Sequence, residues 1–435
     1  MGSATDQFRR MSGCTSQGMA GKVSFDGVSR SLRNRNYAIY TYSNTAAMIG
    51  EWIQRVGVGW LTWELTESTT WLGIIACIDM VPTMLISPFA GAYADRSDRL
   101  RFIQKTVGFT ALQPLTLSCL FFLDLIDIWL LVPLALFNGI LTAFNQAARL
   151  AIIPHLVNRA ELSPAVALSS ITYNISRFAG PAIAGMVIAS GGVGYSFLIN
   201  LLCFIIFTAS LFCITLNKEE SPPRRGNNIL ADTADGLLYT IRHPGIGPVM
   251  FLLIVGSLGQ RPFIELLPGF AGRVFERGPE AFGWMVSLIG MGALVGAVYL
   301  ALRPSLQGLT KIAVHMVLVG AIALIAFSLV GDFHFAMACL LIIGASLSIS
   351  ATGVMTLVQS SVDSHMRGRV LSLYGLIFRG GPAVGAFFMG FAAEHIGLQI
   401  PVILGAAFCI VLWAWVVRNL TRTASVLETE TKPHS

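Results

Sequence analysis

Long apolar runs separated by short polar segments form the dominant pattern of this chain. A helix needs about 20 apolar residues to cross a bilayer, and several runs of that length meet through very short links, as at 191–194 and 331–333. Such links are typical of hairpins between antiparallel helices. The pattern predicts twelve transmembrane helices, at about 37–63, 69–93, 102–123, 128–152, 164–190, 193–216, 245–272, 280–302, 311–331, 333–360, 367–393 and 398–418.

The composition indicates an all-α membrane protein. Hydrophobic residues make up 54% of the chain and charged residues only 12%, whereas a soluble domain carries about 25% charged residues. Such a chain cannot cover a water-facing surface with polar groups. The net charge of +6 comes from Arg and Lys scattered at the ends of the apolar runs, without a basic groove of interleaved aromatic residues, so it does not point to nucleic acid.

The basic residues predict how the chain lies in the membrane. If the N-terminus is placed inside, most of the 29 Lys and Arg residues fall in inner segments, and the outer loops hold only Arg273 and Arg277. Cytoplasmic loops are enriched in Lys and Arg. We therefore expect a multi-pass protein of the inner (cytoplasmic) membrane with both termini in the cytoplasm, working as a monomer surrounded by membrane lipids.

The longest polar interruption divides the chain into two six-helix halves. Its second part has apolar residues at helical spacing, which predicts an amphipathic helix on the membrane surface. The expected organisation is a disordered tail at 1–35, a first bundle at 36–216, a linker at 217–244, a second bundle at 245–420 and a tail at 421–435.

The two halves repeat each other. Residues 165–185 align with residues 368–386, so that Tyr173 meets Tyr374 and a Gly-Pro pair meets a second Gly-Pro pair. Parallel repeats related by an axis along the membrane normal are a known transporter design. The repeat predicts two pseudo-symmetric bundles.

A charged loop between the second and third predicted helices carries a specific resemblance. The segment 91–101 resembles the major facilitator superfamily loop motif, although Asp98 replaces a glycine and Leu100 a basic residue. The resemblance implies twelve helices and a gating cluster that stabilises the outward-open state; the simpler interpretation is inner positive charge alone. We expect Gly91 to permit close helix approach. The residues of this motif are Gly91, Asp95, Arg96 and Arg99, with Arg101 extending the basic run.

The fifth predicted helix resembles the motif of exporters that run as antiporters in the same superfamily. It holds small residues and a proline at the motif positions Ser176, Gly180, Pro181, Ala184 and Gly185, and its repeat holds Gly381 and Pro382. Small residues allow close packing and proline bends a helix. An ordinary packing face explains the same pattern.

Three further segments look most like the bacterial branch of the superfamily that contains enterobactin and macrolide exporters. They are residues 34–44, 144–157 and 242–244. The fourth helix departs from the superfamily, because Ala135 stands where an arginine of the proton relay is often found, and Arg149 lies near the expected cytoplasmic end. A helix-4 relay is therefore in doubt.

Two charges interrupt the first apolar run and return, with signs reversed, 210 residues later. Glu51 corresponds to Arg261, and Arg55 corresponds to Glu265. Charges in the membrane are expensive and face the bundle interior. We expect Glu51–Arg261 and Arg55–Glu265 pairs between the halves, closing an outer gate. The alternative is a neutralising pair within each helix.

Other charges lie inside apolar runs. Asp79 is a candidate proton site together with Glu51, since burial favours the protonated form of a carboxyl group; the alternative for Asp79 is a structural partner of an arginine. Arg177 and Arg379 stand just before the Gly-Pro bends, where they could pair with carboxylates or hold an anionic substrate. Glu394 is expected to be solvated at an outer helix end.

No enzyme motif is present in the sequence: it lacks a phosphate-binding G-x-x-x-x-G-K, an H-E-x-x-H and a metal-spaced Cys/His cluster. We expect no enzyme, no cofactor and no metal. The preferred hypothesis is a proton-coupled exporter that moves an amphipathic small molecule (a siderophore, drug or lipid-like compound) by alternating access. An importer of the same fold is one alternative, and a non-transporting membrane sensor or assembly factor is another.

Overall fold

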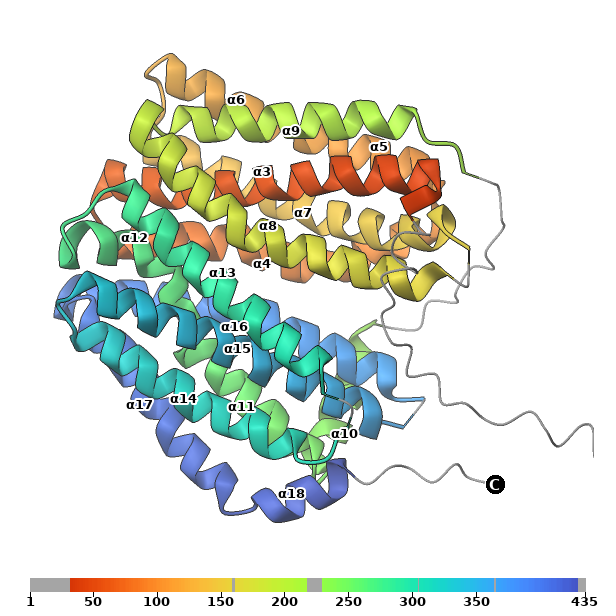
Figure 1. Ribbon diagram of the computed structural model, residues 1–435, viewed down its shortest axis with the longest axis vertical. Helices are drawn as coiled ribbons and strands as arrows, with labels where there is room; N and C mark the ends of the chain where they lie inside the picture. The colour runs from red at the N-terminus through yellow and green to blue at the C-terminus, as the bar shows by residue number, and fades with distance from the viewer. Residues whose placement is uncertain (1–31, 159–160, 217–228, 304, 364, 429–435) are drawn as a thin grey trace, which may run out of the picture.

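The chain folds into two helical bundles that lie side by side (Figure 1). The computed structural model describes residues 32–158, 161–216, 229–303, 305–363 and 365–428, and every regular element in these ranges is helical. Most of the expected tail at 1–35, namely residues 1–31, lies outside the described residues, as do residues 217–228 of the linker. The all-α prediction is confirmed for the described chain.

The first bundle contains seven helical segments. They are α3 (Arg35–Thr66), α4 (Thr69–Arg96), α5 (Arg99–Thr110), α6 (Leu112–Phe122), α7 (Ile128–Leu156), α8 (Leu162–Gly191) and α9 (Gly194–Phe212).

The second bundle follows α10 (Ile229–Arg242), which packs on α16. Its elements are α11 (Ile246–Gly259), η2 (Arg261–Leu266), α12 (Leu267–Gly269), η3 (Phe270–Val274), α13 (Pro279–Ala301), α14 (Leu309–Leu329), α15 (Phe333–Ser361), α16 (Arg367–Ile396) and α17 (Gln399–Val417). The segment expected as a C-terminal tail begins with a further short helix, α18 (Leu420–Leu427).

Within the described chain, 9 helical segments are long and apolar enough to cross a membrane. Of the other expected crossings, α3 and α8 are 32 and 30 residues long but more polar, and the expected span 102–123 is divided at Ala111 into α5 and α6. The multi-pass membrane character is therefore confirmed, and the count of twelve stays a prediction.

Helix ends follow from local sequence. Asn34 and Asp127 cap α3 and α7 by accepting hydrogen bonds from backbone N–H groups of the first turn, which satisfies donors that a helix start leaves open. Gly192 and Gly397 terminate α8 and α16 with φ of 92° and 85°, a left-handed region that glycine enters without strain. A glycine with positive φ therefore ends both the fifth expected helix and its repeat.

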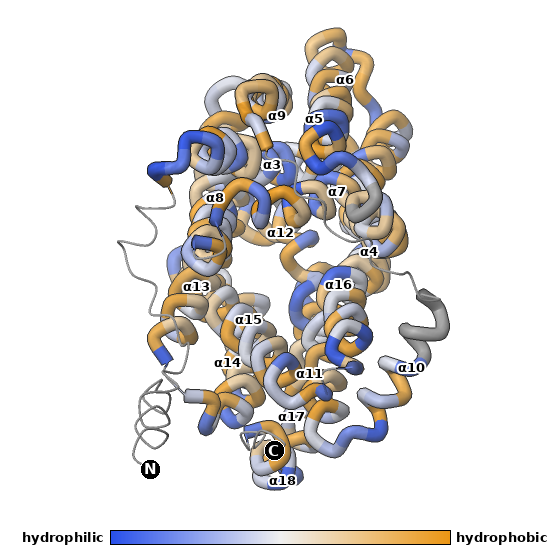
Figure 2. Tube along the Cα trace, turned by 90° about the vertical axis from the view of Figure 1, so that its right-hand side faces the viewer, coloured by the Kyte–Doolittle hydropathy of each residue, from blue (hydrophilic) through white to orange (hydrophobic). Residues whose placement is uncertain are grey.

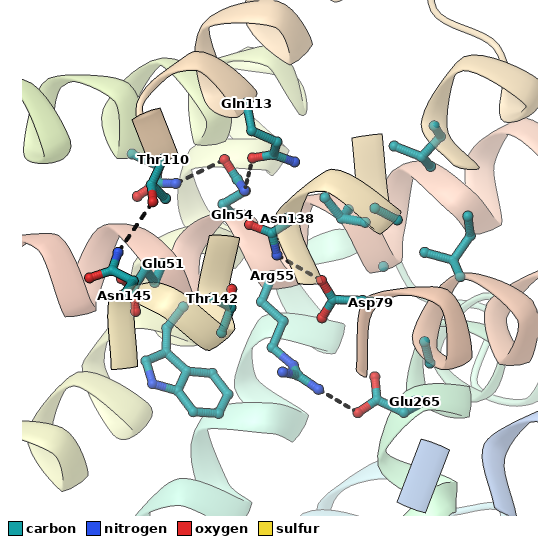
Figure 3. Close-up of a pocket in the computed structure, with 18 of the residues that line it drawn as sticks. Glu51, Gln54, Arg55, Asp79, Thr110, Gln113, Asn138, Thr142, Asn145 and Glu265 are labelled. Atoms are coloured by element: carbon teal, nitrogen blue, oxygen red, sulfur yellow. Dashed lines mark hydrogen bonds and ion pairs between the residues drawn. The ribbon is translucent and has the colours of Figure 1, made fainter. Parts of the chain in front are cut away.

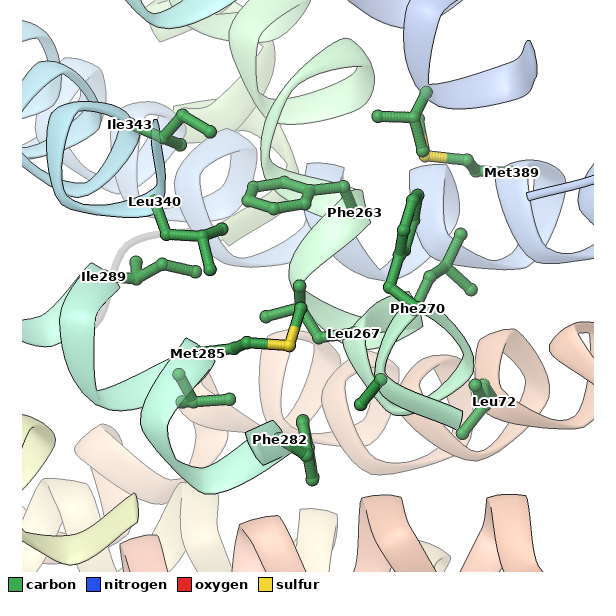
Figure 4. Packing of buried hydrophobic residues seen from close by; sticks show 14 of the residues in the cluster. Leu72, Phe263, Leu267, Phe270, Phe282, Met285, Ile289, Leu340, Ile343 and Met389 are labelled. Carbon is green, nitrogen blue, oxygen red and sulfur yellow. The ribbon is translucent and has the colours of Figure 1, made fainter. Parts of the chain in front are cut away.

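The expected helix at 245–272 is not continuous. After α11 the backbone passes through a 3₁₀ segment, η2, and a π segment, η3, because Pro262 cannot donate the hydrogen bond that an α-helix needs there. Phe263, Leu267 and Phe270 are fully buried and fix this segment against α13 and α15 (Figure 4). The interruption sets the positions of Arg261 and Glu265.

Figure 2 views the bundles down their helix axes and shows apolar residues along much of the outer helices. Large side chains such as Trp129, Leu150 and Phe388 are exposed there, as expected for a surface in contact with lipid. We call the end of the molecule that carries the link between α3 and α4 the far end; the first and last described residues, 32 and 428, lie at the opposite, near end.

The bundles meet through two helix pairs, α4 with α16 and α8 with α13. A Cβ added to Gly73 would lie 2.4 Å from the carbonyl oxygen of Ala386, and one added to Gly283 would lie 2.5 Å from that of Pro181. Side chains at these two positions would therefore push the bundles apart. Both contacts lie toward the far end, so the bundles are tightly closed there.

Candidate functional site

A cavity of about 240 Å³ lies against the first bundle at its border with the second (Figure 3). Its lining comes mainly from α3, α4 and α7, and the second bundle contributes Glu265. The polar and charged lining residues include Glu51, Arg55, Asp79, Asn138, Thr142, Asn145, Gln146, Arg149 and Glu265. The cavity thus gathers most of the charges that interrupt the apolar runs.

A polar stripe on α7 forms one wall of the cavity. Its residues recur at helical spacing, so they share one face of the helix. They are Asn138, Thr142, Asn145, Gln146 and Arg149. Apart from Arg149, these residues were not discussed as site residues in the sequence. Their spacing in an apolar run nevertheless indicates a polar face on this helix.

Arg55 and Glu265 form an ion pair that joins the two bundles. Arg55 Nη2 lies 2.6 Å from Glu265 Oε1, and the guanidinium lies 5.7 Å from the ring centre of Trp52. Arg55 comes from α3 and Glu265 from η2, so the pair crosses the border between the halves. The alternative in which Arg55 is neutralised within its own helix is not what the structure shows.

The expected Glu51–Arg261 pair is wrong. Glu51 Oε1 instead lies 2.5 Å from Arg149 Nη2 of α7, within the same bundle. Arg261 donates a hydrogen bond to the carbonyl oxygen of Phe378 (3.1 Å), and its guanidinium lies 3.9 Å from the centre of the Phe378 ring. The break between α11 and η2, which the repeat did not predict, turns Arg261 toward α16.

Arg149 lies in the last third of α7, and its side chain is turned into the protein. It is only 11% exposed, and its guanidinium lies 5.5 Å from the ring centre of Phe207. Its Nε has no hydrogen-bond partner among the described residues. Arg149 therefore depends on the Glu51 carboxylate for compensation of its charge.

Asp79 faces the cavity from α4. Asn138 Nδ2 donates a hydrogen bond to Asp79 Oδ1 (2.7 Å), and Thr83 Oγ1 donates to the carbonyl oxygen of Gly139 (2.7 Å). Gly139 allows α7 to approach so closely that a Cβ there would lie 2.2 Å from the carbonyl oxygen of Asp79. The carboxyl group thus has an amide donor and no ion pair among the described residues.

A chain of amides runs from the cavity into the first bundle. Gln54 Nε2 donates to Gln113 Oε1 (2.6 Å), and Asn200 Nδ2 donates to Gln54 Oε1 (2.8 Å). These buried groups tie α3, α6 and α9 together. The amide chain holds the face of α3 that carries Glu51 and Arg55 in a fixed position.

The loop motif is only partly described, since the side chains of Asp95 and Arg96 lie outside the described residues. No described atom lies within 4 Å of a Cβ built at Gly91, so the structure shows no close helix contact there and the role expected of Gly91 stays a prediction. Asp98 caps α5 by accepting a hydrogen bond from the backbone N–H of Arg101 (3.0 Å). This cap gives a physical reason for a carboxylate at that position. Arg99 lies in the first turn of α5.

The bend motif packs α8 between both bundles. Ser176 is fully buried, Gly180 abuts Trp52 of α3, and Gly185 abuts Glu280 of α13. Pro181 stands inside α8, as Pro382 stands inside α16. In the second bundle Gly381 abuts Ser257 of α11.

The two arginines before the bends do not pair with carboxylates among the described residues. Arg379 donates to Gln146 Oε1 across the border between the bundles. Arg177 has no hydrogen-bond or ion-pair partner in the described chain, although it is close enough to Arg55 and Tyr173 to interact electrostatically. The structure therefore leaves both guanidinium charges without a carboxylate.

Glu394 is not simply solvated, which corrects the expectation. Its Oε2 accepts hydrogen bonds from Ser68 Oγ (2.9 Å) and from the backbone N–H of Thr69 (2.8 Å). The carboxylate of α16 thus lies at the N-terminus of α4, where the helix dipole favours negative charge. Nearby, Arg273 donates to the carbonyl oxygen of Glu67 (2.7 Å). Both contacts join the bundles at the far end.

Chemically, the charged and amide side chains of this cavity can bind and exchange charges. Among the described residues, no group of three or more His, Cys, Asp or Glu could hold a metal ion. Ion pairs and an unpaired carboxyl group around a cavity between two bundles are suited to movement of a solute or a proton.

A family model described as "Transmembrane secretion effector" matches residues 29–434. Among curated proteins, the chain is 26% identical over 365 residues to the staphyloferrin A transporter of Staphylococcus aureus, covering 82% of this chain and 90% of that protein. It is 24% identical over 334 residues to the enterobactin exporter EntS of Salmonella typhi, covering 76% and 77%.

Solved structures share the fold. An inward-facing, unoccupied bacterial homologue of the human lysosomal transporter Spinster has a TM-score of 0.70 at 13% identity, covering 94% of this chain and all of the other. A POT family transporter in complex with 5-aminolevulinic acid has a TM-score of 0.71 at 11% identity, covering 90% and 97%.

Proposed function

We propose that this chain, which belongs to the transmembrane secretion effector family of major facilitator transporters, is a proton-coupled exporter of an amphipathic organic molecule. The observation that carries the proposal is the charged cavity at the border of the two bundles, where Arg55 and Glu265 pair across that border. Among the curated relatives, one is a staphyloferrin A transporter and another an enterobactin exporter. Siderophores are therefore the first substrates to test.

In this proposal the structure is one state of an alternating-access cycle, in which the cavity opens first to one side of the membrane and then to the other. Counting α3, α5 with α6, and α8 as further crossings gives twelve helices, with the near end and both termini in the cytoplasm of a monomer in the inner membrane. The far-end contacts of Gly73, Gly283 and Glu394 then close the outer side. Export requires these contacts to separate while the near ends approach each other.

Asp79 is the carboxyl group best placed to carry the proton. It faces the cavity, accepts a hydrogen bond from Asn138 and has no ion pair among the described residues. Protonation of Asp79 therefore removes a charge without leaving an arginine unpaired. Protonation of Glu51 or Glu265, by contrast, would leave Arg149 or Arg55 without its carboxylate partner.

The Asp79→Asn variant is expected to lose transport driven by a pH gradient at least tenfold, because an amide cannot bind the proton. Exchange of labelled siderophore for unlabelled siderophore, which needs no net proton movement, is expected to continue. Both rates can be measured in proteoliposomes with enterobactin and with staphyloferrin A. Glu64→Gln, which changes an exposed carboxylate of α3, is the matched control and should leave both rates near those of the unchanged protein.

The same proteoliposomes separate the alternatives. Uptake of siderophore into inside-out vesicles against its gradient supports export, whereas movement only in the reverse direction identifies an importer. No movement of either siderophore or of an amphipathic drug would favour a non-transporting sensor or assembly factor. Equal loss of driven transport and exchange in Asp79→Asn would contradict the proton-binding role of Asp79.

A further inference from the structure

Three guanidinium groups near the border of the bundles lack carboxylate partners among the described residues. Arg379 hydrogen-bonds the Gln146 amide, Arg261 hydrogen-bonds the backbone of Phe378, and Arg177 has neither contact in the described chain. By contrast, Arg55 and Arg149 are each paired with a glutamate. Positive charge therefore exceeds negative charge in this part of the membrane-spanning region.

Two of these arginines come from opposite sides of the border. Arg177 belongs to α8, one helical turn after the cavity-lining Tyr173. Arg261 belongs to η2 of the second bundle, where it contacts Phe378, and its charge interacts unfavourably with that of Arg177. Tyr173 and Tyr374 interact electrostatically with Arg261 as well. The two guanidinium groups thus lie in one region that both bundles form.

The arrangement is least favourable for Arg177. Charged side chains inside the membrane usually pair with one another or with backbone carbonyls and mark substrate or ion pathways. Arg261 has such a partner in the Phe378 carbonyl, whereas no hydrogen bond or ion pair of Arg177 is found among the described residues. Like charges in a partly desolvated region repel more strongly than in water. An anion placed between Arg177 and Arg261 would remove this repulsion and supply acceptors for their N–H groups.

Aromatic rings border the arginines. Tyr173 lies 6.4 Å from Trp52 between ring centres, and both residues line the cavity. Tyr374 stacks on Phe378 at 5.7 Å, beside the Arg261 guanidinium. These rings offer flat apolar surfaces next to positive charge, a combination suited to a molecule with both aromatic or apolar parts and oxyanions.

We infer that Arg177 and Arg261 form an anion-binding subsite for an organic substrate that carries carboxylate or other oxyanion groups. Guanidinium groups bind planar oxyanions through paired N–H donors. The inference rests on the proposed transport function and narrows it, because it excludes organic cations as preferred substrates. Arg379 lies across the border from the cavity-lining Gln146 and can complete the subsite when that contact opens.

Binding to the purified protein in nanodiscs tests the subsite without any requirement for transport. Carboxyfluorescein serves as the anionic probe, and rhodamine 6G, a cation with a related ring system, serves as its counterpart. We expect the unchanged protein to bind carboxyfluorescein more tightly. Each of Arg177→Gln and Arg261→Gln is expected to weaken that binding about tenfold, as for loss of one charge-assisted hydrogen bond, without weakening rhodamine 6G binding.

Several controls make the result interpretable. Arg177→Lys keeps the charge and should recover part of the affinity. Arg277→Gln removes an exposed far-end arginine and should change nothing. Thermal unfolding of each variant in nanodiscs shows whether it is folded. Nanodiscs of phosphatidylcholine and of phosphatidylglycerol distinguish a soluble anion from a lipid phosphate: competition by phosphatidylglycerol that disappears in Arg177→Gln would assign the site to lipid and overturn the substrate role.

The inference is also overturned if folded Arg177→Gln and Arg261→Gln bind carboxyfluorescein as the unchanged protein does, or if rhodamine 6G is the preferred probe. This outcome is distinguishable from failure of the proposed function. If the protein binds the anionic probe through both arginines but moves no siderophore in proteoliposomes, the subsite is supported and the exporter proposal is contradicted.

Discussion

Replacing Glu51 with Gln is expected to reduce stability more than removal of any other carboxylate in the cavity. The change leaves Arg149, which is 11% exposed, without a negative partner. Breaking a buried ion pair costs roughly 3–5 kcal/mol, and the 40% exposure of the Glu51 side chain reduces this, so we expect a loss of about 2 kcal/mol. Reversible unfolding of the purified protein in mixed micelles measures it.

A double-mutant cycle identifies the partner of Glu51. The variant Glu51→Gln/Arg149→Gln is expected to be more stable than Glu51→Gln alone, because no charge is left uncompensated. In the matched cycle with Arg261→Gln, the two losses should add. Coupling of Glu51 to Arg261 instead of Arg149 would show that the pairing described above is not the one that stabilises the protein.

Reversing one charge of the Arg55–Glu265 pair is expected to reduce siderophore transport at least tenfold, and reversing both is expected to restore much of it. Arg55→Glu places two carboxylates against each other across the border, and Glu265→Arg places two guanidinium groups there. Like charges in contact oppose closure of the bundles. In Arg55→Glu/Glu265→Arg the attraction returns with opposite orientation.

Initial rates in proteoliposomes, corrected for the amount of inserted protein, compare the three variants. The exchange Glu51→Arg/Arg261→Glu is the matched control, since these residues are repeat equivalents but do not touch. This double variant should transport siderophore no faster than either of its single variants. If the Arg55–Glu265 exchange is as inactive as Arg55→Glu, closure does not depend on this pair.

The repeat in the sequence predicted contacts only where the backbone also repeats. The 210-residue offset correctly brought Arg55 to Glu265, because η2 keeps Glu265 beside α3. It failed for Glu51, since α3 is a regular helix there whereas its repeat breaks between Gly259 and Pro262. A proline signals such a break, but the direction in which it turns Arg261 depends on packing against α16.

Apolar length and spacing predicted most helices because burial and helix-end chemistry are local. Partners between helices are harder to predict: the position of Arg149 in α7 follows from the sequence, but its salt bridge to Glu51 of α3 does not. The contacts of Glu394 are hidden from the sequence for the same reason. Its partners, Ser68 and Thr69, are more than 300 residues away in sequence, and no local pattern relates them.

The central claim is that the bundles enclose a charged path that opens at alternate ends. Distances between spin-label pairs test it directly, with Ser190→Cys and Glu276→Cys at the far end, and Lys105→Cys and Arg367→Cys at the near end, in a variant without the native cysteines. Lowering the pH or adding siderophore should lengthen the far-end distance and shorten the near-end distance in the same sample. If both distances stay constant under every condition that supports transport, the bundles do not alternate and the account is contradicted.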